Sequence, residues 1–595
     1  MKKLYFITIL LVIAQIPFLG KYLITLYNEF EKICVNKDFL SWDVNIRFII
    51  TLNMMEDIRN WEIHRFIIRF FDAPTWPTLR NLFQTIVFFI TEPSGLNDIR
   101  ITFATLFLLF PAAFYILKKE TKHGKIFLLP FLFLLFWSLL FLSEPVMLYS
   151  LTGMLEIQGS LFLLLSLYFV SKTYEETDLL NTKLPIQIGA FSFLLFLSKY
   201  PYGAFLILGV FAFQAIFYFQ ETYSFGLKYL LHCKTVIRKN YRLWILALLL
   251  LVFLFAPKKA LSGKTIIYLK YLLLFFGSLD FYIYFFKEKK NFIYPLHERM
   301  VLFLQWMVLP ILIWVLLNPD RIGGITDAAT FVKAEGFQKD FQVERNFSYY
   351  LEFFRTFFKT SISDIYLNYL VFGSILVSLA LGSVLLFLKK KAEKHLVFSF
   401  HIFITFFILL FLTPNHQGRH FFHLYPSFIF TFLLLILSIP EKGKYIALVG
   451  VVFLSAYSVY PIVFTPTEQL AKTELCFMGY SPEDYDIPRW VDDKLKNEIK
   501  PNTIFLNYLD PTHVNKSDAE VLLSLSAYKN KARFVINPKK IEKLSPDYKT
   551  LITAANSCNI LEQSPLTEVL KTKPWKLTKD ESSEKACVKS YELLN

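Results

Sequence analysis

The sequence has few charged residues and few cysteines for its length. Only 19% of its 595 residues are charged, whereas 55% are hydrophobic. Soluble domains contain about a quarter charged residues, so this composition excludes a chain whose whole surface faces water. The five cysteines exclude more than two disulfide bridges. Residues 466–595 also lack a Gly-rich phosphate loop, a zinc-binding pattern and a nucleophile elbow, so no nucleotide or hydrolase motif marks that part.

Long apolar runs are abundant up to about residue 465 and then stop. Several approach the ~20 residues that cross the hydrocarbon core of a bilayer. Clusters of lysine and arginine separate them, and the positive-inside rule assigns such short clusters to the cytoplasm. If these clusters are cytoplasmic and successive connections alternate between the two sides of the membrane, the chain has about thirteen spans. The predicted spans are 4–27, 99–117, 126–142, 153–171, 185–198, 201–219, 243–256, 265–286, 300–317, 367–388, 396–413, 421–438 and 445–465.

The charge balance divides the chain at the same place. Residues 466–595 contain 19 basic and 19 acidic residues, so the whole excess of +15 belongs to the apolar part. We attribute that excess to membrane topology and expect no nucleic-acid partner. The N-terminal run could be a cleaved signal peptide, but no small-residue cleavage site follows and Lys21 interrupts it, which favours a first span.

These patterns predict a polytopic α-helical protein of the inner (cytoplasmic) membrane. Residues 1–465 form its transmembrane domain, with a cytoplasmic N-terminus and long outer loops at about 28–98 and 318–364. In the first loop, Trp61 to Phe71 has apolar positions at helical spacing, which predicts an interfacial helix. Residues 466–595 alternate helix-like and strand-like stretches, which predicts a small extracytoplasmic α/β domain. There, Cys476, Cys558 and Cys587, like Cys34, would face an oxidising compartment, with their pairing open.

An acidic residue just after the first span is the most informative single position. Asp43 follows Ser41-Trp42 at the outer membrane face. A carboxylate there can take a proton from a hydroxyl that attacks an anomeric carbon, which is a general-base role. The alternative is a solvated surface charge. Asp57, farther along the same loop, is the substitute candidate.

Charged residues also occur at span ends on the predicted outer side, against the positive-inside tendency. Arg100, Lys199 and Arg419 could converge on a lipid phosphate, or they could simply extend to the interface. Glu156 lies within an apolar span, where a carboxylate costs about 2.5–3.5 kcal/mol and is a functional candidate by default. Tyr200 adjoins Lys199. His420 is the remaining candidate, although aromatic packing is a simpler role for it than zinc binding.

The order of these features resembles the GT-C superfamily of membrane glycosyltransferases. The branch is glycosyltransferase family 39, which includes the protein O-mannosyltransferases and the aminoarabinose-transferase-like proteins. Members carry an acidic motif after span one, then a "PPL"-like segment, and an Arg at the start of span two. Farther along they carry an acidic residue in span four, a basic residue at an outer turn and an "R-Y-hydrophobic-P" segment. The matching segments here are Ser41 to Asn45, Pro74 to Leu79, Leu96 to Arg100, Leu155 to Gly159, Ser198 to Tyr200 and Gly418 to Pro426.

The resemblance implies transfer of a hexose or pentose from a polyprenyl-phosphate donor to a lipid, glycan or protein hydroxyl, with inversion and an Asp base. It implies no certain cofactor and leaves a divalent metal open. Many relatives have two adjacent acidic residues where this chain has Asp43-Val44, and His-Pro-Pro-Leu where it has Thr75 to Leu79. These departures bear on metal coordination and on contacts with the acceptor.

Two other readings remain. A transporter or flippase of lipid-linked glycans would also carry embedded charge, but transporters commonly show repeated halves, and no internal repeat is visible here. A non-enzymatic envelope assembly protein that uses its C-terminal domain for binding is the third reading. In each case membrane lipids are expected partners.

Overall fold

A computed structural model of the chain places most of its residues. It describes residues 2–33, 42–72, 77–121, 125–143, 146, 149–176, 179–227, 298–318, 321, 348, 366–388, 392–412, 419–464, 486–495, 497–509, 518–536, 548–583 and 586–594. The boundary expected near residue 465 therefore lies outside the described residues, as do Cys34, Cys233 and Cys476.

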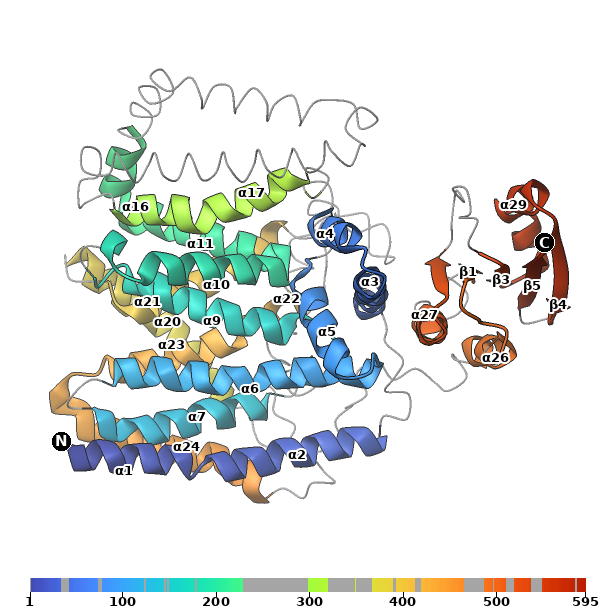
Figure 1. Cartoon of the computed structure of the whole chain (residues 1–595). Helices are drawn as coiled ribbons and strands as arrows, with labels where there is room; N and C mark the ends of the chain where they lie inside the picture. Colours follow the sequence, from blue (N-terminus) through green and yellow to red (C-terminus); the bar gives the residue numbers. More distant parts are fainter. Residues whose placement is uncertain are drawn as a thin grey trace.

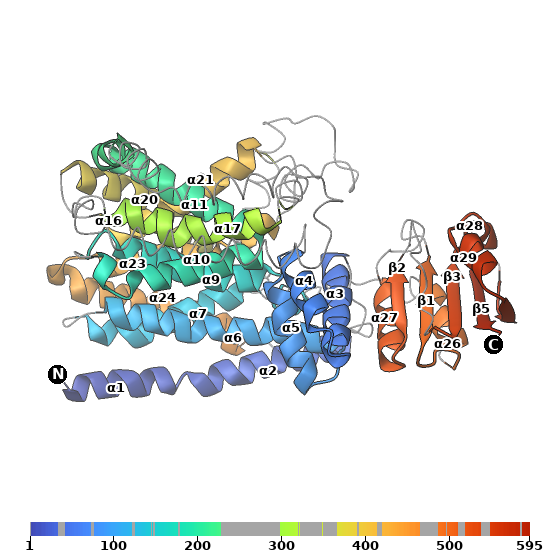
Figure 2. The same ribbon diagram turned by 45° about the horizontal axis from the view of Figure 1, so that its top comes forward.

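Most of the described helices between residues 2 and 464 form an apolar bundle in which they run roughly along one direction (Figures 1 and 2). Ala14 and Gln15 interrupt the first pair, and a π-helical stretch, η4 (Phe303–Val308), joins α16 to α17. The bundle helices are α1 (Lys2–Ile13), α2 (Ile16–Ile33), α6 (Gly95–Glu120), α7 (Leu129–Leu142), α9 (Glu156–Lys172), α10 (Leu184–Ser198), α11 (Tyr200–Phe217), α16 (Glu298–Leu302), α17 (Leu309–Leu317), α20 (Tyr366–Phe387), α21 (Lys394–Leu412), α22 (Arg419–Phe422), α23 (Tyr425–Leu437) and α24 (Lys444–Phe464). Short 3-10 turns are η1 (Ile126–Leu128), η2 (Leu179–Asn181) and η5 (Glu441–Gly443).

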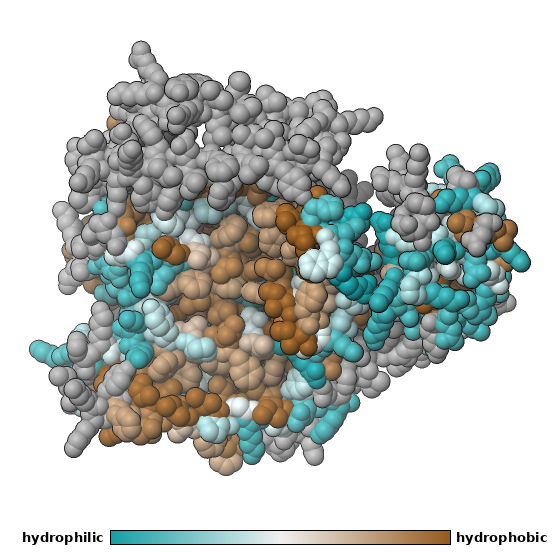
Figure 3. All heavy atoms as spheres, viewed as in Figure 1, coloured by the Kyte–Doolittle hydropathy of each residue, from teal (hydrophilic) through white to brown (hydrophobic). Residues whose placement is uncertain are grey.

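The bundle is built to face lipid. Within the described part of the chain, seven helices are long and apolar enough to cross a membrane, and four apolar helices are shorter. Large apolar side chains such as Phe387 and Ile446 are mostly exposed on them, and Figure 3 shows an apolar surface over the bundle. Of the predicted spans, 243–256 and 265–286 lie outside the described residues, and helices occupy the others. The chain is a multi-pass membrane protein.

Three helices of the first long loop cover one end of the bundle, beside the C-terminal domain (Figure 2). They are α3 (Trp42–Arg59), α4 (Ile63–Asp72) and α5 (Leu79–Ile90). The helix predicted over Trp61 to Phe71 is α4. We call this end of the bundle the domain end. Of the second long loop, the structure describes only positions 318, 321 and 348.

The C-terminal domain is a small α/β unit, as its alternating pattern predicts. A mixed sheet has the strand order β2-β1-β3-β5-β4. Strand β1 pairs in parallel with β2 and β3, and β5 pairs antiparallel with β3 and β4. β1 and β3 are buried along their whole length, because central strands are covered on both faces. The elements are α26 (Asp486–Leu495), β1 (Thr503–Tyr508), α27 (Asp518–Lys529), β2 (Arg533–Ile536), β3 (Thr550–Ala555), α28 (Cys558–Glu562), α29 (Leu566–Thr572), β4 (Trp575–Asp580) and β5 (Cys587–Leu593).

A disulfide links two parts of this domain, and a helix contact joins the domain to the rest of the chain. A disulfide joins Cys558, at the start of α28, to Cys587 on β5. Helix α27 packs on α3, where the guanidinium of Arg59 lies 4.7 Å from the ring centre of Tyr528. Tyr528 and Leu525 also pack against the apolar core of the bundle. The domain therefore contacts α3, the helix whose first turn contains the predicted base Asp43.

Candidate active site

A buried polar cluster lies at the domain end, between α5 and the start of α6. Arg80 of α5 forms an ion pair with Asp98 of α6, with 2.6 Å between Nη2 and Oδ1. Arg80 also donates to Thr102, and Gln84 donates to the same Asp98 oxygen at 2.6 Å. The Arg80 and Asp98 side chains are at most 1% exposed. Two opposite charges are therefore held away from solvent at the head of a membrane-spanning helix.

Helix α3 joins the cluster through its first two turns. Arg47 donates to the carbonyl of Gly153 at 2.9 Å, and Asn81 donates to the carbonyl of Arg47. Gly153 lies so close to Asp98 that a Cβ atom at position 153 would collide with the carboxylate. Oδ2 of Asp98 accepts no hydrogen bond within the described part of the chain. Glycine at this position thus lets the segment before α9 lie directly against the charged cluster.

A second ion pair lies just beyond that segment. Glu156 is the first residue of α9, and its carboxylate Oε1 is 2.9 Å from Nζ of Lys199. The side chains are 1% and 14% exposed. Three residues span at most roughly 11 Å, so Glu156 lies within that distance of Gly153 along the chain. The Glu156–Lys199 pair and the Arg80–Asp98 pair are therefore neighbours at the domain end.

Local backbone geometry places Lys199 there. It is the extended residue between α10 and α11, with φ −158° and ψ 116°. Pro201 follows in the first turn of α11, where proline is tolerated. The break turns the Lys199 side chain toward α9, and its ammonium also lies 5.0 Å from the ring centre of Tyr202.

Aromatic packing extends the site to the segment after residue 418. The ring of Tyr202 stacks on His423, with centroids 3.7 Å apart and 13° between the planes. Gly159 of α9 makes room for Tyr202, because a Cβ at position 159 would lie 2.5 Å from a ring carbon. The predicted residues Arg419 and His420 lie in α22, just before His423, and their side chains are outside the described part of the structure.

The other predicted residues are more dispersed. Tyr200 is buried and accepts a hydrogen bond from Trp314 at 3.3 Å. Arg100 is exposed and donates to the hydroxyl of Tyr27 on α2 at 2.8 Å. It is two residues from Asp98, a rotation of about 200°, and so lies on another face of α6. Asp43 lies in the first turn of α3, and its side chain is outside the described residues.

Asp57 lies apart from the polar cluster around Arg80 and Asp98. It pairs with Arg69 of α4 at 2.5 Å. Burial raises the pKa of Asp57, and the charge of Arg69 opposes that rise. Ten helical residues separate it from Arg47, a distance of about 15 Å along α3, whereas position 43 is one turn from Arg47.

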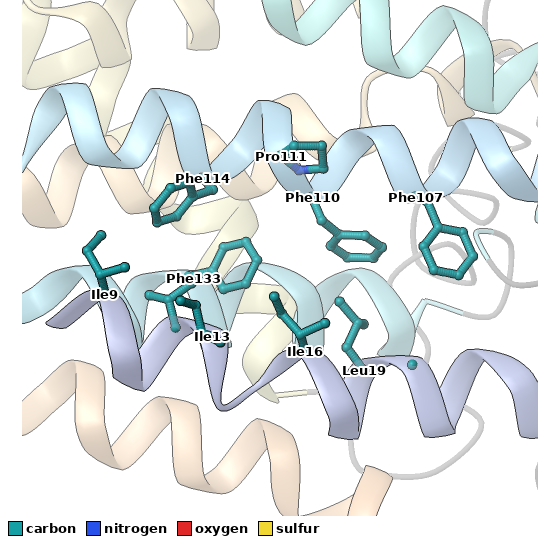
Figure 4. A pocket seen from close by; sticks show the side chains of 11 residues that line it. Ile9, Ile13, Ile16, Leu19, Phe107, Phe110, Pro111, Phe114 and Phe133 are labelled. Atoms are coloured by element: carbon teal, nitrogen blue, oxygen red, sulfur yellow. The ribbon is translucent and has the colours of Figure 1, made fainter. Parts of the chain in front are cut away.

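An apolar cavity of about 440 Å³ lies beside α6, on the face that holds Phe107, Phe110 and Phe114 (Figure 4). It lies among α1, α2, α6 and α7, and its walls are formed by Ile9, Val12, Ile13, Ile16, Leu19, Gly20, Phe107, Phe110, Pro111, Phe114 and Phe133. Phe103 contacts both Tyr27 and Phe107 and so connects the cavity to Arg100. Arg100 therefore lies about two turns of α6 from Phe107 in the cavity wall.

Sequence reasoning overlooked Arg47, Arg80 and Asp98. The signal for Arg80 was present in the predicted loop, because positions 80, 81, 84 and 85 place polar residues at helical spacing in an otherwise apolar stretch. Within the described residues, no group of three or more His, Cys, Asp or Glu side chains is arranged to hold a metal ion.

Comparison with known proteins gives a structural similarity. No family model matches the chain, and no curated protein matches it. Two solved structures of ArnT from Cupriavidus metallidurans, one bound to undecaprenyl phosphate and one in the apo state, align over 97% of this chain and 97% of their own. The TM-scores are 0.48 and 0.49, at 10% and 9% sequence identity respectively.

Proposed function

We propose that this protein is a membrane glycosyltransferase that moves a sugar from a polyprenyl-phosphate donor to a hydroxyl of a lipid, glycan or protein. The observation that carries the proposal is the Glu156–Lys199 ion pair beside the buried Arg80–Asp98 pair. Buried ion pairs are weak contributors to stability, and ionisable groups in membrane spans are functional candidates by default. Their position at one end of the spans matches chemistry at the membrane surface.

In the proposed reaction the acceptor oxygen attacks the anomeric carbon while the bond from that carbon to the phosphate oxygen breaks. Asp43 takes the proton of the acceptor hydroxyl. The polyprenyl phosphate leaves as an anion, and Lys199 and Arg419 bind it. Attack opposite the leaving group inverts the anomeric centre.

The remaining residues position the reactants. Glu156 holds Lys199 and orients the donor or the acceptor, while Tyr200 and His420 line the substrate site. Arg100 binds the anionic headgroup of a lipid, and Phe103 and Phe107 lead from it toward the apolar cavity, which suits an isoprenoid chain. Asp57 is the substitute base. Its pairing with Arg69 and its distance from Arg47 favour Asp43.

The proposed orientation puts the domain end outside the inner membrane and the N-terminus in the cytoplasm. It is supported by the lysine clusters at the opposite end of the bundle, including Lys118 and Lys119 at the end of α6.

The test is release of polyprenyl phosphate by the purified full-length chain in proteoliposomes. Undecaprenyl-phosphate-linked hexoses and pentoses serve as donors, with envelope lipids as acceptors. We expect Lys199→Gln to abolish release and Lys442→Gln, at the opposite end, to leave it unchanged. Movement of a donor across the bilayer without cleavage would instead identify a flippase and contradict the proposal.

A further inference from the structure

A polar cavity of about 190 Å³ lies at the other end of the bundle, among α6, α9 and the first turn of α10. By volume it holds about six water molecules. Its walls are formed by Tyr115, Lys119, Tyr168, Phe169, Lys172, Glu176, Thr182, Lys183, Leu184 and Gln187. Asp98 and Lys119 are 21 residues apart on α6, roughly 30 Å along its axis, so this cavity is separate from the candidate active site.

The cavity wall is positively charged. Three lysines face one glutamate, Glu176, across it. The nearby carboxylate of Glu120 is 2.5 Å from Lys394 but 3.9 Å from Lys172, so its closer partner is Lys394. Lys394 in turn lies 2.8 Å from Glu175. Glu120 and Glu175 share Lys394, and Glu120 also pairs with Lys172. The wall itself has three lysines and one glutamate, and with these neighbours the group of four lysines and three glutamates carries a net charge of +1.

The cavity lies where α6 and α9 end and α10 begins, and the ends of membrane-spanning helices meet the lipid headgroups. Tyr115 is 40% exposed at its rim, and Ile186, next to the cavity on α10, is 60% exposed. Tyrosines are enriched at membrane–water interfaces. Lysines bind phosphate as point charges, and basic pockets between membrane helices bind anionic headgroups. Gln187 adds an amide group that can donate to a phosphate oxygen, whereas the hydroxyls of Tyr168 and Thr182 donate to Glu120 and to the carbonyl of Leu179.

We propose that this cavity is a binding site for a phosphate group, presented by an anionic phospholipid of the leaflet opposite the candidate active site. The recognised chemistry is a phosphate oxyanion held by Lys119, Lys172 and Lys183. A free phosphate offers the same chemistry, so the experiment separates the two sources. The site is independent of the proposed glycosyl transfer.

The test uses the full-length chain in lipid nanodiscs of phosphatidylglycerol and phosphatidylcholine. Retention of phosphatidylglycerol after transfer to detergent is measured by native mass spectrometry. The test variant is Lys119→Gln with Lys183→Gln, because both lysines are exposed and Lys172 contacts the Glu120 network. The matched control, Lys118→Gln with Lys442→Gln, removes two exposed charges from the same end outside the cavity wall.

Each basic residue near an anionic lipid contributes roughly fivefold, so we expect the test variant to bind phosphatidylglycerol about 30-fold more weakly than wild type. The control should bind as wild type does. If phosphatidylglycerol is not retained but inorganic phosphate raises the melting temperature of wild type and not of the test variant, the site takes free phosphate. Equal lipid retention and equal response to phosphate in wild type and test variant would overturn the proposal.

Discussion

The ammonium of Lys199 lies 2.9 Å from the carboxylate of Glu156, although the two residues are 43 positions apart and on different helices. The pair is buried at the end of the bundle that also holds Arg80 and Asp98. Charges in such a place are costly unless paired, because removing an ion from water is expensive. The two ion pairs are therefore candidates for a functional role.

The first prediction concerns Lys199. Replacing it with glutamine removes a charge-assisted hydrogen bond to phosphate, which contributes about 1.5–3 kcal/mol. Binding of a polyprenyl phosphate, measured by native mass spectrometry, should weaken by at least about tenfold. Lys199→Arg keeps the charge and should retain most of the affinity.

Because Lys199→Gln also leaves Glu156 without its partner, the double variant Lys199→Gln with Glu156→Gln is the matched control for folding. It should recover part of the melting temperature lost in the single variant and none of the phosphate affinity. Recovery of both would mean that Lys199 acts only through packing.

A second prediction concerns the Arg80–Asp98 pair. Removing one partner of a buried pair costs about 3–5 kcal/mol, because the other charge is left buried. Asp98→Asn should therefore lower the melting temperature strongly. Glu62→Gln breaks the exposed pair with Arg65 and should cost at most about 1 kcal/mol. Equal small effects of the two substitutions would show that the Arg80–Asp98 pair is not protected from solvent.

The pH dependence of stability tests the surroundings of Glu56 on α3. Burial raises the pKa of Glu56, and the charges of Arg59 and Arg533 oppose the rise while Asp57 adds to it. A raised pKa in the folded state means that folding favours the protonated form of Glu56. Its stabilising contribution is therefore present at pH values below the ordinary pKa of a glutamate, and it is lost as the pH rises through the pKa of Glu56 in the folded protein.

The melting temperature of wild type relative to Glu56→Gln should therefore fall as the pH is raised from 4 to 7. Measuring both proteins across this range cancels the other titrating groups. A difference that stays constant or increases with pH would contradict the burial of this carboxyl.

The contact of Arg59 with Tyr528 predicts that α3 holds the C-terminal domain. Exposed cation–π contacts contribute about 0.5–1 kcal/mol, so Arg59→Ala should speed hydrogen exchange in α27 several-fold. Arg65→Ala, on α4, serves as the control and should leave α27 unchanged. Unchanged exchange in both variants would show that this contact does not hold the domain.

The architecture was largely predictable because long apolar runs and lysine clusters have direct physical causes in the bilayer. Glu156 and Lys199 were predictable as candidates for the same reason, since charge within apolar spans is conspicuous. Their contact was not predictable, because it depends on how α9, α10 and α11 pack. Asp98 was overlooked because an acidic residue at a predicted loop end resembles a solvated charge, and only the structure shows it beside Arg80 and Gly153.

The C-terminal domain shows the same limit. The alternation of helix-like and strand-like stretches predicted an α/β unit. Strand-like stretches at Thr503 to Asn507 and Ala532 to Ile536 correspond to β1, which runs one residue farther, and to β2. Long-range pairing set the rest: β5 pairs with β3 although β4 precedes it in the chain, and Cys558 pairs with Cys587. Neither follows from local periodicity.

The most direct test of the central claim is sugar transfer by Asp43→Asn in proteoliposomes, with Asp57→Asn measured alongside. The account predicts that Asp43→Asn abolishes release of polyprenyl phosphate while the protein still inserts and still binds polyprenyl phosphate, and that Asp57→Asn keeps turnover near wild type. Wild-type turnover in Asp43→Asn would contradict the assignment of Asp43 as the base.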